Sequence, residues 1–167
     1  GGGGAAGFFA AAGKKADKTA ASAAFDDGSD SDEGEAASAA GAERAKAAGN
    51  DAFGRGDFAE AVKQFSLAVR LDSKNHVLYS NRSAARASLG KAQEALEDAQ
   101  KCVELQPQFA KGYSRQGAAL VLMGKYKEAM RAYKKGLEVD PANAGLLKGL
   151  DDLRASLRQG ELPTAES

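Results

Sequence analysis

Hydrophobic and polar positions along the chain repeat with a spacing of about 34 residues. The segment 42–75 is echoed by 76–109 and again by 110–143. Inside each copy, two stretches with helical spacing of apolar residues are separated by a glycine. The pattern therefore predicts three copies of one unit, each made of a first helix, a short glycine turn and a second helix.

Aligning the three copies places small, aromatic and helix-breaking residues in matched columns. The clearest columns are Gly49, Ser83 and Gly117; Gly56, Gly90 and Gly124; Phe65, Ala99 and Tyr133; and Ser73, Pro107 and Pro141. Small residues are expected where two helices approach closely, and aromatic residues where the gap between helices must be filled. Glycine favours a left-handed helix end, and proline stops a helix.

A further helix is predicted after the third copy. Residues 144–158 carry leucines at helical spacing on one side, and charged residues cover the other side. The leucines are Leu146, Leu147, Leu150, Leu153 and Leu157. One helix pair cannot bury its apolar face alone, whereas three stacked pairs with a capping helix can.

A helix-turn-helix unit repeated every 34 residues is typical of tetratricopeptide repeats (TPRs). The predicted fold is therefore an all-α TPR superhelix. It consists of three repeats and a C-terminal capping helix over residues 42–159, followed by a short tail, 160–167.

Residues 1–41 have a different composition, dominated by Gly, Ala, Ser and acidic residues, with three Lys against seven Asp and Glu. Such a segment cannot offset the loss of chain entropy by burial, so we expect a disordered N-terminal tail. Ser29 and Ser31 lie between acidic residues, which is a setting for phosphorylation by an acid-directed serine kinase. The simpler interpretation is a solvating linker.

Charge and composition together exclude several classes of partner and location. The chain carries 23 basic and 23 acidic residues, and outside the tail the basic surplus is too small for a nucleic-acid interface. No apolar run is long enough to span a membrane, and the glycine-rich start is not expected to be a signal peptide. A single cysteine fits a reducing compartment. We expect a cytoplasmic monomer.

Few residues support catalysis. His76, the only histidine, is expected on the surface near a helix start, and Cys102 falls in a column of small residues, as a packed core thiol would. No Cys/His cluster has the spacing of metal ligands, and no glycine-rich phosphate loop is present. The sequence therefore predicts a protein that is not an enzyme and needs no cofactor or metal.

Five polar residues indicate a binding site on the concave face that the first helices of such repeats line. Lys46 and Asn50 lie on one side of a helix, as do Lys111 and Arg115, and Asn81 lies on the helix between. Asparagine is a poor helix former, so two asparagines in the middle of helices call for an explanation. The alternative is that all five are solvated surface residues.

These side chains together would form a positive pocket rich in hydrogen-bond donors. Such a pocket suits a ligand with two carboxylates close together, which a peptide ending in Asp supplies at its C-terminus. Arginine can bind a carboxylate with two parallel hydrogen bonds, while lysine acts as a mobile point charge.

The residues Lys46-x-x-x-Asn50, His76–Ala85 and Lys111–Arg115 resemble the carboxylate-clamp TPR domains of co-chaperones. The similarity is greatest to the first TPR domain of the heat-shock organising protein (stress-inducible protein) family, and it covers about residues 42–158. The resemblance implies that Lys46, Asn50, Asn81, Lys111 and Arg115 bind the Glu-Glu-Val-Asp tail of cytosolic heat-shock chaperones. It implies the seventy-kilodalton class more than the ninety-kilodalton class.

Two residues of the second repeat depart from the family pattern, Arg86 and Ala92. We expect either that the aliphatic stem of Arg86 covers the space beside Ala92, with its charged head in water, or that this repeat is the loosest. Two other functions remain open. One is a scaffold for a different acidic C-terminal peptide. The other is the targeting domain of a larger enzyme, such as a phosphatase, prolyl isomerase or ubiquitin ligase.

Overall fold

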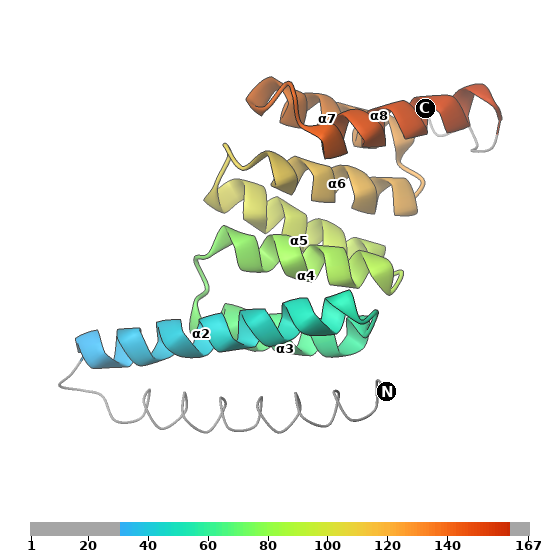
Figure 1. Ribbon diagram of the computed structural model, residues 1–167. Helices are drawn as coiled ribbons and strands as arrows, with labels where there is room; N and C mark the ends of the chain where they lie inside the picture. The colour runs from blue at the N-terminus through green and yellow to red at the C-terminus, as the bar shows by residue number, and fades with distance from the viewer. Residues whose placement is uncertain (1–30, 161–167) are drawn as a thin grey trace.

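The computed structural model describes residues 31–160, and within them the chain forms helices joined by short turns (Figure 1). The helices are α2 (Ser31–Gly54), α3 (Phe58–Leu71), α4 (His76–Ser88), α5 (Ala92–Leu105), α6 (Ala110–Leu122), α7 (Tyr126–Val139) and α8 (Ala144–Arg158). Three antiparallel pairs, α2–α3, α4–α5 and α6–α7, follow one another, and α8 covers the last pair. The predicted all-α superhelix of three repeats and a capping helix is confirmed, and α8 has the predicted bounds.

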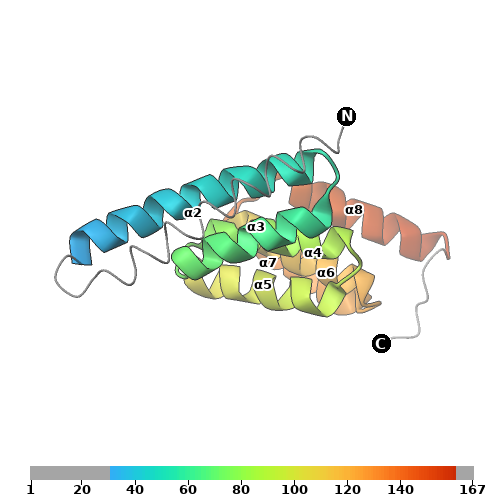
Figure 2. The same cartoon turned by 90° about the horizontal axis from the view of Figure 1, so that it is seen from below.

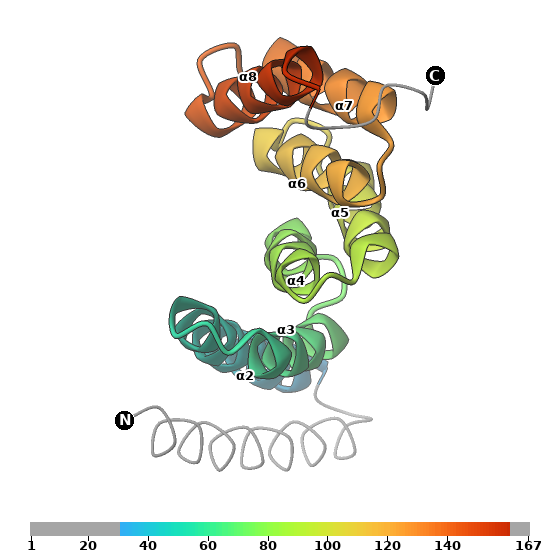
Figure 3. The same cartoon turned by 90° about the vertical axis from the view of Figure 1, so that its right-hand side faces the viewer.

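The pairs stack so that the first helix of each lies along one side and the second along the other (Figure 3). Helix α2 contacts α4, α4 contacts α6, and α6 contacts α8. Over residues 31–160, by contrast, the second helices α3, α5 and α7 do not contact one another. Helices on the inner side of a curved stack lie closer together than those on the outer side. The contacts therefore place α2, α4 and α6 on the inner, concave side.

Each pair turns at a glycine with a left-handed backbone. Gly56, Gly90 and Gly124 have φ of 78°, 77° and 74°, a conformation that glycine adopts without the steric cost other residues meet. The nearly equal angles show that the three repeats turn in the same way, as the aligned column of glycines predicts.

The two helices of a repeat pack by matching a small residue to a large one. A Cβ atom built on Gly49 would lie only 2.5 Å from the Phe65 ring, and Gly117 faces Tyr133 with the same lack of space. In the second repeat the equivalent pair is Ser83 and Ala99, and both are fully buried. The Ser83 hydroxyl donates a 2.7 Å hydrogen bond to the Ala95 carbonyl, so this repeat replaces ring packing with a short polar contact.

Helix α8 closes the apolar end of the stack with three buried leucines, Leu146, Leu150 and Leu153. The close approach of Leu146 requires a glycine at position 136 on α7, because a Cβ there would lie 2.8 Å from the leucine side chain. Leu147 was expected on the same side, but it is 42% exposed. It immediately follows Leu146, and the rotation of about 100° per residue turns it out of the contact.

Helix α2 begins at Ser31, so the expectation of disorder was wrong for residues 31–41. This helix projects past the end of its partner α3 (Figures 1 and 2). Alanine and glutamate, which are frequent here, are strong helix formers, and Gly41 and Ala42 are buried. A Cβ on Gly41 would lie 3.1 Å from Leu71, so the helix packs on α3 from that point onward. Ser31 begins α2, whereas Ser29 lies in the stretch 1–30 of the predicted tail, which is outside the described residues.

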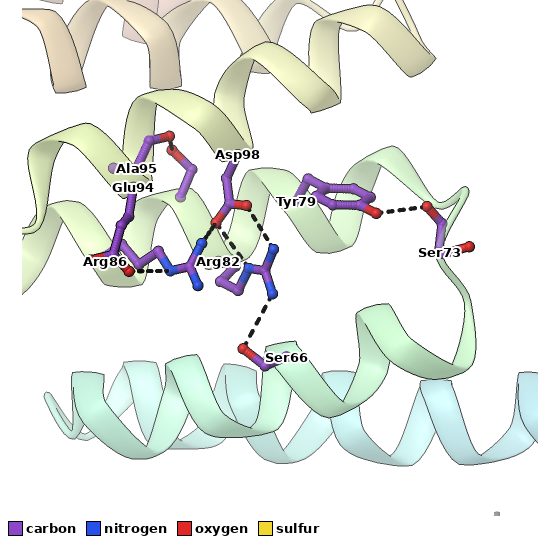
Figure 4. Close-up of polar contacts among 9 residues, drawn as sticks. Ser66, Ser73, Tyr79, Arg82, Arg86, Glu94, Ala95 and Asp98 are labelled. Carbon is purple, nitrogen blue, oxygen red and sulfur yellow. Dashed lines mark hydrogen bonds and ion pairs between the residues drawn. The ribbon is translucent and has the colours of Figure 1, made fainter.

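The second repeat contains a buried ionic cluster (Figure 4). Arg82 on α4 donates two hydrogen bonds to the Asp98 carboxylate on α5, at 2.9 and 2.8 Å, and a third to the Ser66 hydroxyl on α3 at 3.3 Å. Arg86 also donates to Asp98, at 2.8 Å, and lies 3.7 Å from Glu94. The expectation that the head of Arg86 lies in water was therefore wrong, because a carboxylate on the facing helix holds it.

Candidate functional site

The concave side contains a cavity of about 200 Å³ between the first helices of the three repeats. Its polar lining is Asn50 from α2, Asn81 from α4 and Arg115 from α6. These are three of the five predicted site residues, and they are up to 65 positions apart in the chain. The stacking of successive repeats brings them to one wall, as the aligned copies predict.

Asn50 and Asn81 contact each other across the first two repeats. The Asn81 Nδ2 donates a hydrogen bond of 3.2 Å to the Asn50 Oδ1. Each carboxamide has two N–H donors, so the Asn50 amide nitrogen and the second Asn81 N–H stay free of this contact. The pair therefore places two amide groups side by side at the cavity, with donors left for an anionic ligand.

Arg115 supplies the formal charge of the cavity lining, whose other residues are amides and apolar side chains. Burial lowers the pKa of this guanidinium below its ordinary value, with a smaller opposing effect from Cys102. Arginine nevertheless remains protonated at neutral pH. A cation that has lost part of its water gains more from a carboxylate than a fully hydrated one, because the surrounding dielectric is lower.

The two predicted lysines do not line the cavity. Lys46 lies one helical turn before Asn50 on α2, and Lys111 lies one turn before Arg115 on α6, so each is roughly 6 Å further along its helix. Lys111 is exposed. The Lys46 ammonium lies 3.4 Å from the Glu43 carboxylate, and such surface pairs are weak. Both lysines have the length to reach a ligand that extends beyond the cavity.

The cavity also has an apolar part, lined by Phe53, Phe65 and Ala84, which the sequence pattern did not assign to the site. Phe53 is 36% exposed, and its ring meets the edge of Phe58 with centroids 5.1 Å apart. The only sequence signal for this part of the cavity was Phe53, a large aromatic residue near the end of the helix that also carries Lys46 and Asn50. This apolar part can receive a hydrophobic side chain next to the polar wall.

The chain has one histidine and one cysteine, and the environment of each is that of a packed residue rather than a catalytic one. His76 begins α4, as predicted, and is partly buried with its ring 4.7 Å from that of Phe109. Cys102 is fully buried, which confirms the predicted core thiol. Burial raises the pKa of the Cys102 thiol to about 11, although nearby Arg115 partly opposes the shift. Neither group has the exposure expected of a nucleophile.

We expect Cys102 to be inert in the folded protein. At pH 8 roughly one thiol in a thousand is ionised when its pKa is about 11, and its sulfur is out of contact with solvent. A coloured disulfide reagent should therefore label the protein only in denaturant, and the labelling rate should follow the fraction unfolded. Complete labelling within minutes in native buffer would contradict this environment.

Residues 31–160 contain neither of two other kinds of site. Within that stretch no three His, Cys, Asp or Glu side chains gather as ligands of a metal ion would. None of its helices combines the length and apolar character that crossing a membrane requires.

Comparison with known proteins agrees with the fold. Family models described as Tetratricopeptide repeat match residues 77–109 and 110–143. The first TPR domain of human RPAP3 is 32% identical to this chain, with a TM-score of 0.67 over 72% of this chain and 94% of that domain. The chain belongs to the tetratricopeptide-repeat family.

This TPR domain is homologous to TPR domains of Hsp70-Hsp90 organizing proteins. It is 67% identical over 115 residues to Hsp70-Hsp90 organizing protein 2 of Arabidopsis thaliana. It is 49% identical over 118 residues to the heat shock protein sti1 homolog of Schizosaccharomyces pombe. These alignments cover 69% and 71% of this chain, but the chain spans about a fifth of the length of the curated relatives it matches.

Two related solved structures contain peptides. The first TPR of Spaghetti (RPAP3) is described as bound to the HSP90 peptide SRMEEVD; it is 32% identical, covers 70% of this chain and 93% of its own, and has a TM-score of 0.65. The second TPR domain of human RPAP3 is described in complex with the HSP70 peptide SGPTIEEVD, at 26% identity, a TM-score of 0.62 and coverage of 66% and 92%.

Proposed function

We propose that this TPR domain is a co-chaperone adaptor that binds the acidic C-terminal tail of cytosolic heat-shock chaperones. The tail ends in Glu-Glu-Val-Asp, and Lys46, Asn50, Asn81, Lys111 and Arg115 bind the carboxylates of its last residue. The adaptor works in the cytoplasm as a monomer, without catalysis. The observation that supports the proposal best is the cavity that Asn50, Asn81 and Arg115 line together, because it gathers donor-bearing side chains from three helices.

The chemistry of the cavity matches a peptide C-terminus that ends in Asp. Such a terminus has two carboxylates, one on the backbone and one on the side chain, and they are close enough for a single polar wall to contact both. The Arg115 guanidinium and the Asn50 and Asn81 amides supply donors, while Lys46 and Lys111 supply charge one turn away. The valine before the last residue suits the apolar lining of Phe53, Phe65 and Ala84.

The related proteins support the same ligand. Two TPR domains similar to this chain are described with peptides that end in EEVD, one from HSP90 and one from HSP70. The homologous curated proteins are named for both chaperones. This chain is therefore proposed to bind tails of the seventy-kilodalton class, the ninety-kilodalton class, or both, with preference for the first.

The proposal is tested by titrating a synthetic Glu-Glu-Val-Asp peptide into the wild-type protein and into Arg115→Ala and Lys111→Ala, with the heat of binding as the signal. A charge-assisted hydrogen bond contributes about 1.5–3 kcal/mol. Each substitution should therefore weaken binding about 10- to 100-fold. Lys135→Ala, which removes an exposed cation from α7, is the matched control and should bind as tightly as the wild type.

The peptide offers a second control, since amidation of its C-terminus removes one of the two carboxylates and should also weaken binding. Equal affinity of the wild type, Arg115→Ala and Lys111→Ala would contradict the clamp. If the clamp variants weaken a different acidic C-terminal peptide more than this one, the domain is instead a scaffold for that partner. Longer tails of the two chaperone classes, compared in the same titration, measure the preference between them.

A further inference from the structure

Ser80 is a buried residue that contacts Arg115 of the site from the interior of the protein. It lies on α4 beside Asn81, and its side chain is fully buried, so it is not part of the cavity lining. Its hydroxyl accepts a hydrogen bond of 3.3 Å from the Nε of Arg115 on α6. The two residues are 35 positions apart in the chain and belong to different repeats.

The nitrogen used in this contact determines what Arg115 can still do. A guanidinium has five N–H donors, one on Nε and the others on the two terminal nitrogens. The hydrogen bond to Ser80 uses the inner donor and leaves both terminal amino groups available. A ligand carboxylate can therefore meet the end of the guanidinium with two parallel hydrogen bonds, the arrangement that gives arginine its geometric specificity.

We propose that Ser80 is a positioning residue, which fixes the Arg115 guanidinium in the orientation that binds a peptide carboxylate. This inference rests on the proposed function, because it assigns a role in the same site. An arginine side chain has high rotamer freedom, and holding it in place before the ligand arrives removes an entropic cost of binding. Asn81 and Ser80 are consecutive, so α4 orients Asn50 on one neighbour and Arg115 on the other.

The cluster behind α4 supports this role. Arg82 follows Asn81 in sequence and is bound to Asp98 on α5 and Ser66 on α3. The rotation of α4 about its axis is thereby tied to both helices of the outer side that pack against it. Ser80 is thus presented to Arg115 from a helix that is fixed on its other face.

A double-mutant cycle tests the proposal, with the Glu-Glu-Val-Asp peptide and the full chain. Ser80→Ala should weaken peptide binding about 2- to 10-fold, and it should have no further effect when Arg115 is already alanine. Ser83→Ala is the matched control. It removes a buried hydroxyl from the same helix, one whose hydrogen bond goes to Ala95 rather than to the site, and should leave the affinity unchanged.

An NMR measurement reports on the contact without ligand. The Nε–H signal of Arg115 should exchange with water more slowly than those of exposed arginines, and this protection should be lost in Ser80→Ala but kept in Ser83→Ala. Unchanged affinity in Ser80→Ala, or an equal loss in the Arg115→Ala background, would overturn the positioning role. Failure of the wild type to bind the peptide would overturn the proposed function itself, together with the role of Ser80 in binding.

Discussion

Replacing Asp98 with alanine is expected to lower the free energy of unfolding by about 3–5 kcal/mol. The Asp98 side chain is only 5% exposed, and it accepts hydrogen bonds from two arginines of α4. Removing the carboxylate leaves the Arg82 and Arg86 guanidinium groups facing each other with most of their water already displaced. The variant thus loses the attraction that offsets the repulsion between these two like charges.

Urea denaturation followed by circular dichroism measures this change. Asp152→Ala is a matched control, since it breaks a Lys148–Asp152 pair of comparable length, 2.6 Å, on the solvent-exposed face of α8. The control should unfold at the same urea concentration as the wild type, because exposed ion pairs contribute little. Similar midpoints for Asp98→Ala and Asp152→Ala would show that burial does not strengthen the cluster.

Phe65→Ala is expected to be as destabilising, at about 3–5 kcal/mol. Phe65 is 1% exposed and is the largest of the fully buried side chains in residues 31–160. Its ring fills the space that Gly49 leaves on the facing helix. The substitution opens a cavity between α2 and α3 that the glycine cannot fill. Both the lost burial of the ring on folding and the empty volume contribute to the destabilisation.

The second repeat indicates how this loss can be reduced. Its equivalent pair is Ser83 and Ala99. Gly49→Ser combined with Phe65→Ala therefore gives the first repeat the same residue pair as the second. Gly49→Ser alone should destabilise by about 1–3 kcal/mol, because its Cβ meets the ring. The double variant should be more stable than the two single losses predict, by about 0.5–3 kcal/mol. Additive losses would show that the two positions are not coupled through packing.

The architecture was predictable because the same pattern of glycine, apolar and polar positions occurs in all three repeats. The glycines at 56, 90 and 124 align in sequence and have nearly equal backbone angles, and the bounds of α8 follow from its leucines. The same alignment predicts that Asn50, Asn81 and Arg115 share one wall, and the cavity lining contains all three. Repetition turns a weak local signal into a strong one, because every copy tests the same assignment.

The features that escaped prediction depend on information the repeat does not carry. Residues 31–41 are rich in alanine, which favours a helix yet offers little to bury, so composition alone could not separate a helix from a disordered tail. The main partner of Arg86 is a carboxylate on the next helix, and the sequence of that helix offers acidic residues at Glu94, Glu97, Asp98 and Glu104 without indicating which of them faces Arg86. Ser80 carries no sequence signal at all, since its contact with Arg115 exists only when two repeats are stacked.

The inner contacts between α2, α4 and α6 have a mechanical consequence for a domain of this shape. The groups at the cavity belong to three successive units, each of which touches only its neighbours, so no single unit sets the distance from Asn50 to Arg115. That distance follows the curvature of the whole stack. A force that straightens the superhelix would move Asn50 and Arg115 apart and weaken ligand binding. Conversely, a ligand that contacts both residues would make the superhelix more resistant to bending.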